Sequence, residues 1–215
     1  NGKGDKYLGD WINSRNLEKE IIVIGKGAHT PQCDPQFIRP QILESLERLN
    51  IQTLDIFCLH RDNPDIPVSE FMDALDEVKS EGLINLIGAS NWELARFSEA
   101  RNYAQSHNKE PFTALSNNFS LAEMVDPVWP GCVGVNDEYI TYLLENNVML
   151  FPWSSQARGF FIKKKEITSN EHFSNPSLED EIRVWHNEKN LKSRDTCFEI
   201  AEQKNLQPLQ VALAY

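Results

Sequence analysis

The chain has 215 residues, of which 40% are hydrophobic and 25% are charged, with 10 glycines and 11 prolines. That composition is ordinary for a globular protein and is long enough for one large domain or two small ones. The formal net charge of -11 argues against nucleic acid or an anionic membrane as partner, because both would require a basic surface. No apolar stretch approaches the length of a transmembrane helix.

Four cysteines are spread along the chain, at Cys33, Cys58, Cys132 and Cys197. They form no CxxC pair, so the spacing suggests neither a zinc site nor a thioredoxin-type redox site. The pattern suits a reducing compartment, and we therefore expect a cytoplasmic location. Cys58 lies inside the apolar run LDIFCLH and is expected to be a small buried side chain.

Short apolar runs alternate with longer segments of helical periodicity. The first run, IIVIG, has β-branched residues on both faces, as a strand buried on both sides requires. The patterns predict strands at 21–25, 54–59, 83–88, 112–115 and 148–151, and helices at 36–49, 68–81, 92–105, 137–146, 193–204 and from 208 onward. Residues 160–187 are polar, and we expect them to be irregular.

Strict alternation of strand and helix predicts parallel strands joined by right-handed crossovers. A doubly wound open sheet and a closed barrel both satisfy it, but no glycine-rich dinucleotide fingerprint follows any strand. A complete (β/α)8 TIM barrel has eight strands and about 250 residues. The five units found here predict an α/β fold that is an incomplete barrel, with its first and last strands missing. No linker interrupts residues 1–215, which are expected to form a single domain.

Polar residues follow each predicted strand, where a β/α-barrel carries its active site. A lysine, a histidine, hydroxyls, amides and an aromatic ring would suit proton transfer to an uncharged, planar ligand with polar edges. Each residue alone has an ordinary structural explanation, such as a Ser–Asn turn, but five sets at equivalent positions favour a site. In chain order the sets are Lys26, His60 with Arg61 and Asp62, Ser90–Asn91, Ser116–Asn117, and Trp153–Ser154–Ser155.

The segments VIGKGAH, LDIFCLHRDN, IGASNWE, ALSNNFSL and FPWSSQARGFF resemble the successive strand-end motifs of the aldo-keto reductase family. The resemblance runs in register from about Tyr7 to Tyr215. HRDN and PWSSQARGFF are similar to the bacterial-type branch, some of whose members are fused to other oxidoreductase domains. The resemblance implies reduction of a small aldehyde or ketone by hydride transfer, with NADPH as the usual cofactor and NADH as the alternative. It leaves the oligomeric state open.

The family resemblance also implies roles for individual residues. Lys26 matches the lysine of an Asp, Tyr, Lys and His tetrad, where it lowers the pKa of the tyrosine proton donor. His60 matches the histidine that orients the carbonyl. The residues that match the family's cofactor site are Ser90, Asn91, Ser116 and Asn117 at the carboxamide, Trp153 against the nicotinamide ring, and Ser154, Ser155, Gln156 and Arg158 at the pyrophosphate.

Two departures from the family pattern affect these expectations. The family commonly has glutamine where this chain has Ser116. The tetrad tyrosine and aspartate are expected upstream of residue 1, and the last strand is expected after residue 215. We therefore expect the chain to be truncated at both ends and inactive by itself.

Other classes of protein fit less well. HRDN resembles part of a kinase catalytic loop, but the asparagine expected further along is missing. Neither Ser90 nor Ser154 lies in the GxSxG elbow of a hydrolase. A divalent-metal barrel would require several ligands, and only His60 with Asp62 qualifies, so no metal site is expected. A catalytically weak, cofactor-binding regulatory protein of the same fold stays open, because phenylalanine in place of the upstream tyrosine would favour it.

Overall fold

The computed structural model of the chain describes residues 2–162 and 176–215. The chain forms two compact units, the first made of Asn1–Ser116 with Thr141–Phe151 and the second of Asn117–Ile140 with Pro152–Tyr215. Each unit is described by itself below. The expectation of a single domain stays a prediction.

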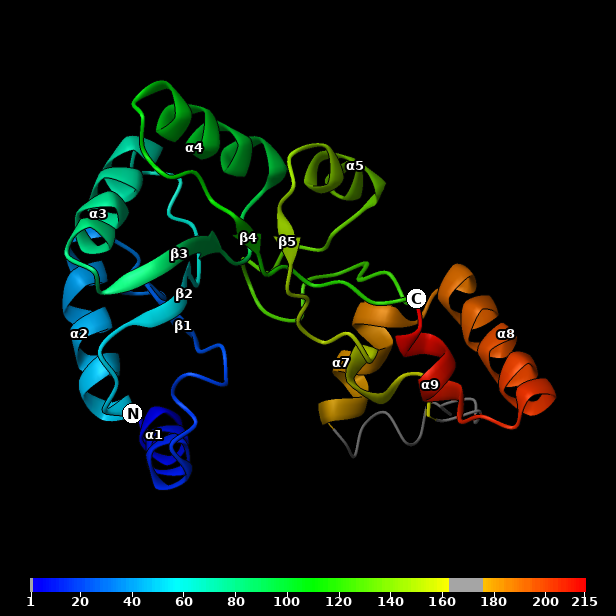
Figure 1. Cartoon of the computed structure of the whole chain (residues 1–215). Coiled ribbons are helices and arrows are strands. Elements are labelled where there is room, and N and C mark those ends of the chain that lie inside the picture. Colours follow the sequence, from blue (N-terminus) through cyan, green and yellow to red (C-terminus); the bar gives the residue numbers. More distant parts are fainter. Residues whose placement is uncertain (1, 163–175) are drawn as a thin grey trace. The chain divides into compact units, whose positions relative to one another are not determined.

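The first unit contains a five-stranded parallel sheet (Figure 1). Each strand pairs with the next one along the chain, in the order β1-β2-β3-β4-β5. Sequential order is the arrangement of a β/α-barrel, whereas a doubly wound sheet reverses direction in the middle. The predicted α/β fold with parallel strands is therefore confirmed. The strands are β1 (Ile24–Gly27), β2 (Leu54–Leu59), β3 (Ile84–Ala89), β4 (Ala114–Leu115) and β5 (Met149–Leu150).

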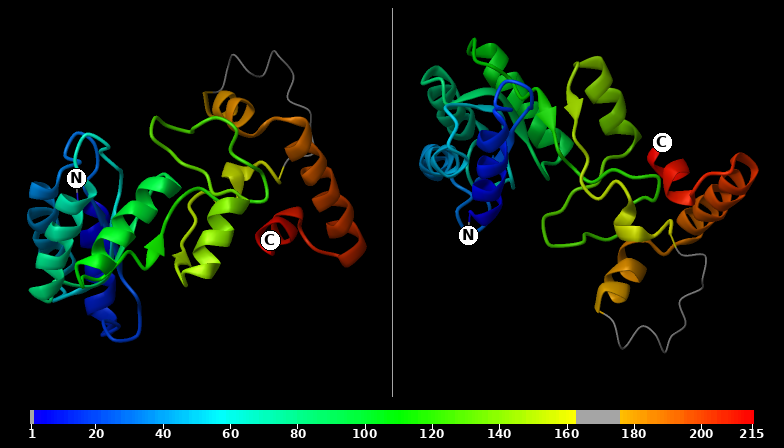
Figure 2. Two further views of the ribbon diagram at one scale, coloured as in Figure 1. Left: turned by 90° about the horizontal axis from the view of Figure 1, so that it is seen from above. Right: turned by 60° about the horizontal axis from the view of Figure 1, so that its bottom comes forward.

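Helices follow the strands as the periodicity predicts. In the first unit, α2, α3 and α4 lie along one face of β1–β3 in every view (Figures 1 and 2). α2 buries Ile38, Ile42, Leu46 and Leu49, whose spacing of four, four and three residues forms one helical stripe. The helices of this part are α1 (Lys3–Arg15), α2 (Ile38–Leu49) after the 3-10 turn η1 (Pro35–Phe37), α3 (Val68–Ser80), α4 (Leu94–Ser106) and α5 (Asp137–Glu145), which runs across the boundary between the two units.

In its described residues, the second unit consists of a 3-10 turn and three helices around an apolar cluster. The cluster includes Phe160, Phe161 and Trp185, each fully buried. The elements are η2 (Ala157–Gly159), α7 (Pro176–Trp185), α8 (Glu188–Lys204) and α9 (Pro208–Leu213).

The prediction that residues 160–187 are irregular is wrong for α7. Its sequence begins with Pro176 and has Glu179 in the first turn, which are both typical of a helix start, whereas the expectation rested on low hydrophobicity alone. Residues 163–175 of that segment lie outside the described residues.

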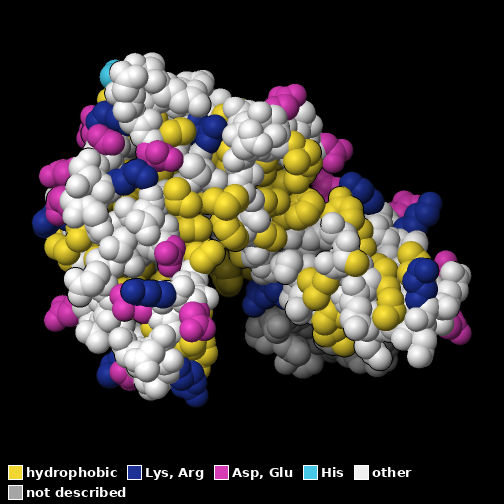
Figure 3. Space-filling view, in the orientation of Figure 1, with side chains coloured by type: hydrophobic (Ala, Val, Ile, Leu, Met, Phe, Trp, Pro, Cys, Tyr) yellow, Lys and Arg dark blue, Asp and Glu magenta, His cyan; other side chains and the backbone are white. Residues whose placement is uncertain are grey.

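Part of the surface of the first unit is apolar. Apolar side chains gather over β4 and β5 in the space-filling view (Figure 3). The two edge strands each leave one large apolar side chain partly exposed, Ile24 in β1 and Met149 in β5, both at 39%. In the part of the chain that the structure describes, no helix is both long enough and apolar enough to cross a bilayer.

Candidate active site

The register of the sheet places several candidate residues on one face. Lys26 pairs with Cys58, Cys58 with Gly88, and Gly88 with Ala114. Side chains alternate between the two faces of a strand, so residues two positions further along point to the same face. The next row on the face that carries Lys26 therefore consists of His60, Ser90 and Ser116, each directly after its strand.

Gly88 keeps this face closely packed. A Cβ atom there would lie 2.8 Å from the sulfur of Cys58 and 2.8 Å from the carbonyl oxygen of Ala114. Since both distances are well below van der Waals contact, only glycine fits between these neighbours without displacement.

The structure corrects the position of Lys26. The apolar run IIVIG led to the expectation that Lys26 lies just past the first strand, but it is the third residue of β1. The ladder with β2 begins only at Ile24, and the N–H of Val23 donates to the side chain of Asp55 at 2.7 Å. Hydrophobicity predicts that a strand is present, but its register depends on the partner strand. As a result Lys26 is level with Cys58 and lies two residues before the level of His60 along the strands, on the same face of the sheet.

Hydrogen bonds join the strand-end residues into a continuous chain. Lys26 Nζ donates to Ser116 Oγ at 2.8 Å, and Ser90 Oγ donates to the Ser116 carbonyl at 2.5 Å. Asn91 Nδ2 donates to Ser90 Oγ at 3.1 Å and to the His60 carbonyl at 3.4 Å. Five residues from four successive strand ends are thus fixed relative to one another.

The residues in the middle of this hydrogen-bonded series are buried, and main-chain hydrogen bonds hold them as well. Ser90, Asn91 and Ser116 are 0%, 5% and 4% exposed. The N–H groups of Ser90 and Ser116 continue the ladder by donating to Leu59 and Ala89. Asn91 has a φ of 58°, a left-handed conformation that asparagine tolerates better than most residues. Such a site is preorganised, because its polar groups need no rearrangement to hold their positions.

His60 is electrostatically unusual. Burial, followed by the nearby His29, Lys26 and Arg61, lowers the pKa of His60 to about 4. The imidazole is therefore neutral at pH 7 and offers one donor and one acceptor nitrogen. His29 lies edge-on to it, with ring centroids 4.6 Å apart, and is held by a 2.8 Å contact between its Nδ1 and the Thr30 carbonyl. Sequence reasoning missed His29, whose only signal is its place three residues after Lys26.

The ionisation of Lys26 is also perturbed. Burial lowers the pKa of Lys26, Cys58 opposes that effect, and Arg61 adds to it. Lys26 is nevertheless exposed overall, so solvent screens the perturbation. Burial raises the pKa of Cys58 to about 11. Cys58 is 0% exposed, which confirms the expectation of a small buried side chain rather than a reactive thiol.

The remaining predicted cofactor residues lie in the second unit. The N–H of Trp153 donates to the Asn117 carbonyl at 3.3 Å, and Asn118 Nδ2 donates to the Trp153 carbonyl at 3.1 Å. The indole packs against the apolar cluster that contains Phe160 and Phe161. Its Nε1 is buried and has no hydrogen-bond partner among the described residues. Asn117 itself is fully buried.

The loop after Trp153 has a strained backbone. Ser154, Ala157 and Arg158 have φ values of 52°, 45° and 52°, and each such non-glycine residue costs on the order of 1–3 kcal/mol. Ser154 and Ser155 are partly exposed and Gln156 is exposed.

Arg158, at the end of this loop, already has partners. Its guanidinium lies 5.4 Å from the centre of the Trp129 ring and 3.5 Å from a carboxylate oxygen of Asp180. Both side chains of this ion pair are over a third exposed, so the pair is weak and can exchange for another anion.

The metal alternative gains no support from the geometry. Asp62, the expected partner of His60, instead forms an ion pair with Arg96 at 3.1 Å. Across residues 2–162 and 176–215, no cluster of three or more His, Cys, Asp or Glu side chains could hold a metal ion.

The sequential parallel sheet and its polar strand ends define a protein of the β/α-barrel class. A model of the Aldo/keto reductase family matches residues 1–215. The chain therefore belongs to the aldo/keto reductase family, as the strand-end motifs predict.

Known relatives agree with this assignment. The chain is 28% identical to an aldo-keto reductase of Fusarium vanettenii, over 100% of the chain and 64% of the relative. It is also 28% identical to the versiconal hemiacetal acetate reductase of Aspergillus parasiticus, over 99% of the chain and 54% of the relative. The chain thus spans less than two thirds of the length of either protein. Both are fungal, and the expected bacterial-type branch stays a prediction.

A solved structure supports the fold. A crystal structure assigned as a 2,5-diketo-D-gluconic acid reductase B superposes with a TM-score of 0.69 at 17% identity. The match covers 97% of this chain and 58% of that one. At this identity the likeness bears on the fold alone.

Proposed function

We propose that the whole protein is a nicotinamide-dependent reductase that converts an aldehyde or ketone to an alcohol. The observation that carries this proposal is the hydrogen-bonded chain from Lys26 through Ser116, Ser90 and Asn91 to the His60 carbonyl. It joins the ammonium group of Lys26 to uncharged polar groups, and the neutral imidazole of His60 follows on the same sheet face. Carbonyl reduction uses all three kinds of group.

The chemistry of His60 and Lys26 suits a carbonyl substrate. A neutral His60 can donate a hydrogen bond to a carbonyl oxygen and so orient it and stabilise the charge that develops there. The Lys26 ammonium favours the ionised form of an acidic group beside it. In the whole protein that group would be the tyrosine of the tetrad that the family resemblance implies.

The donor set fits a nicotinamide. Its carboxamide is neutral and has both donors and acceptors, and Ser90 and Asn91 offer a buried hydroxyl and amide without a net charge. The hydroxyl of Ser116 already accepts a hydrogen bond from Lys26, and serine is shorter than the glutamine that the family commonly has at this position. We therefore assign a larger share of the carboxamide contact to Asn91 and Asn117. When bound, the cofactor supplies the hydride.

The second unit supplies the other proposed cofactor contacts. Trp153 offers an aromatic ring for the nicotinamide, and Ser154, Ser155 and Gln156 offer hydroxyl and amide groups for the pyrophosphate. Arg158 adds a positive charge that suits a phosphate. NADPH is the expected cofactor and NADH the alternative.

The test is a steady-state assay of the whole protein with a panel of aldehydes and ketones. We expect aldehyde-dependent oxidation of NADPH that survives dialysis against a chelator, because neither the hydride nor the acid comes from a metal. Tight cofactor binding without turnover of any carbonyl would contradict the proposal and favour the regulatory alternative. Activity lost on chelation and restored by zinc or magnesium would instead favour a metal enzyme.

A further inference from the structure

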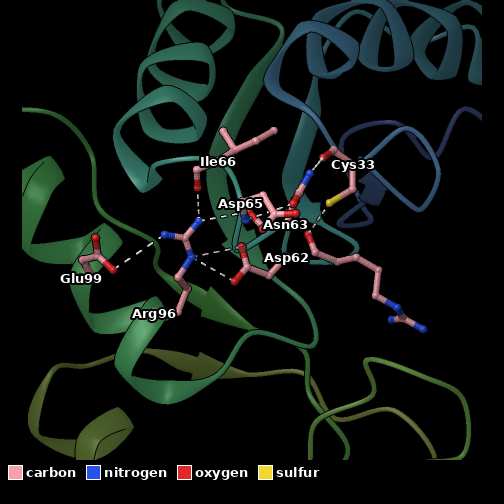
Figure 4. Close-up of polar contacts among 8 residues, drawn as sticks. Cys33, Asp62, Asn63, Asp65, Ile66, Arg96 and Glu99 are labelled. Atoms are coloured by element: carbon pink, nitrogen blue, oxygen red, sulfur yellow. Dashed lines mark hydrogen bonds and ion pairs between the residues drawn. The ribbon is translucent and has the colours of Figure 1, made fainter.

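Arg96 is attached to the loop that carries His60. From α4, its Nε donates to both carboxylate oxygens of Asp62, at 3.4 and 3.1 Å (Figure 4). Its Nη2 donates to the Asn63 carbonyl at 3.2 Å and also to the Ile66 carbonyl. One guanidinium therefore binds three points of the segment that directly follows His60.

The position of Arg96 is itself well fixed. Its side chain is 16% exposed and that of Asp62 is 14% exposed. The guanidinium lies 5.6 Å from the centre of the buried Trp92 ring, and its Nη1 lies 3.8 Å from Glu99 one turn along α4. A largely buried, multiply bonded arginine of this kind is far more constraining than an exposed ion pair.

The opposite side of the same loop is held by the segment after β1. Asn63 Nδ2 donates to the Cys33 carbonyl at 3.0 Å, and the Cys33 thiol donates to the Arg61 carbonyl at 3.2 Å. Figure 4 shows Cys33 on the side of Asn63 that faces away from Arg96. The loop after His60 is thus tied on both sides.

We infer that Arg96 is a positioning residue that fixes His60 relative to the Ser90–Asn91 pair. Arg96 follows Asn91 by five residues, on the helix that starts after β3, and Asp62 follows His60 by two. The clamp therefore connects the strand end that carries the imidazole with the one that carries the proposed carboxamide contacts. Lysine cannot replace it fully, because an ammonium lacks the planar fork that reaches a carboxylate and two carbonyls together.

This inference rests on the proposed function, and its kinetic test uses R96M and R96K in the whole protein. Misplacing a reacting group by about 1 Å can cost on the order of 10²-fold in rate. We expect kcat to fall about 10- to 10²-fold in R96M and less in R96K, with nearly unchanged cofactor affinity. The matched control is R39M, since Arg39 makes a similar bidentate contact with Glu81 and neither residue belongs to the candidate site. R39M should keep wild-type kcat.

A double-mutant cycle separates the clamp from general destabilisation. R96M alone leaves the Asp62 carboxylate buried and unpaired, which is costly, whereas D62N with R96M removes both charges. If Arg96 acts through Asp62, the double variant should lose no more kcat than R96M. If the separate losses of kcat in R96M and in D62N instead multiply in the double variant, the clamp is contradicted.

A second readout does not depend on catalysis. Amide hydrogen exchange of residues 60–66 should be at least about tenfold faster in R96M and in the double variant than in R39M, because charge-assisted hydrogen bonds that close the loop are gone. The His60 ring resonances should shift as well. Unchanged exchange and resonances would overturn the inference. Wild-type protein without any turnover would overturn the proposed function, and the exchange experiment would still decide the clamp.

Discussion

The two groups of candidate residues are positioned by different means. In the first unit, Lys26, His60, Ser90, Asn91 and Ser116 are placed by sheet register and joined by hydrogen bonds. In the second unit, Trp153 and the loop after it depend on a strained backbone and on packing against an apolar cluster. A sheet fixes side-chain direction residue by residue, whereas a loop fixes it only through its own conformation.

This difference suggests that the two groups of residues have different roles. The proposed proton-transfer and carboxamide groups are held by hydrogen bonds, and Ser90, Asn91 and Ser116 among them are buried. The proposed pyrophosphate contacts are at least partly exposed and weakly paired. Precise geometry matters most where bonds are made and broken, while a flexible charged ligand tolerates an adaptable site. Variants of the first group should therefore change turnover, and variants of the second should change cofactor affinity.

Lys26→Met gives the largest expected effect. In the whole protein it should lower kcat by roughly 10²–10⁴-fold, the usual contribution of general acid catalysis, because the ammonium that tunes the proton donor is gone. Cofactor affinity, measured by fluorescence titration, should hardly change. Lys6→Met is the control, since Lys6 is exposed and pairs with Asp10 one turn along the same helix. Near wild-type reduction by the Lys26 variant would refute its assignment.

Ser116→Ala should have an intermediate effect. It removes the hydroxyl that accepts from Lys26, so we expect stability to fall by about 1 kcal/mol and kcat to fall roughly tenfold as the lysine gains freedom. Denaturant unfolding and steady-state kinetics measure the two effects. Ser106→Ala, which removes exposed local hydrogen bonds to Tyr103 and His107, should change neither. A Ser116 variant with wild-type kcat would show that this bond does not position the lysine.

Trp153→Ala should act on the second group only. Loss of ring stacking should weaken NADPH binding by about 1 kcal/mol and reduce the quench of tryptophan fluorescence on titration, with kcat largely retained. Trp153→Phe keeps a ring and should recover much of the affinity. Trp11→Ala is the control, since Trp11 is 42% exposed in α1. Equal quench and affinity in wild type and Trp153→Ala would argue against stacking.

The last prediction concerns the pH dependence of stability rather than a rate or an affinity. His60 has a pKa of about 4 in the folded chain against an ordinary value of 6.5. Above pH 6.5 both states are neutral at this residue. Between about pH 6.5 and 4 the unfolded state takes up the proton before the folded state does, so the free energy of unfolding should fall as the pH falls. Below pH 4 both states are protonated, and the loss of stability should stay constant.

Denaturant unfolding across this pH range tests that expectation. His60→Gln should lose part of the acid slope, and His107→Gln, a change at an exposed residue, should keep it. Identical slopes in wild type and His60→Gln would contradict the lowered pKa of the half-buried His60 imidazole.

Local patterns in the sequence predict much of the fold. The strand at 54–59 and the helix starting at Val68 lie where their periodicity places them. Ser90 and Ser116 directly follow their strands as expected. These features depend on residues close together in the chain, which is why a single sequence reveals them.

Long-range contacts explain what the sequence could not predict. The start of β1 depends on its register with β2, and the ion pair between Asp62 and Arg96 joins positions 34 residues apart. The bond from Lys26 to Ser116 spans 90 residues. None of these has a periodic signature, because each exists only after the sheet has assembled.

The most direct test of the account is transfer of a labelled hydride in the whole protein. NADPH deuterated at the reactive carbon of the nicotinamide should be incubated with an aldehyde substrate, and the alcohol analysed by mass spectrometry. The account predicts one deuterium on the former carbonyl carbon, and a much slower transfer in Lys26→Met at equal cofactor occupancy. An alcohol without deuterium, or equal transfer rates in the two proteins, would contradict it.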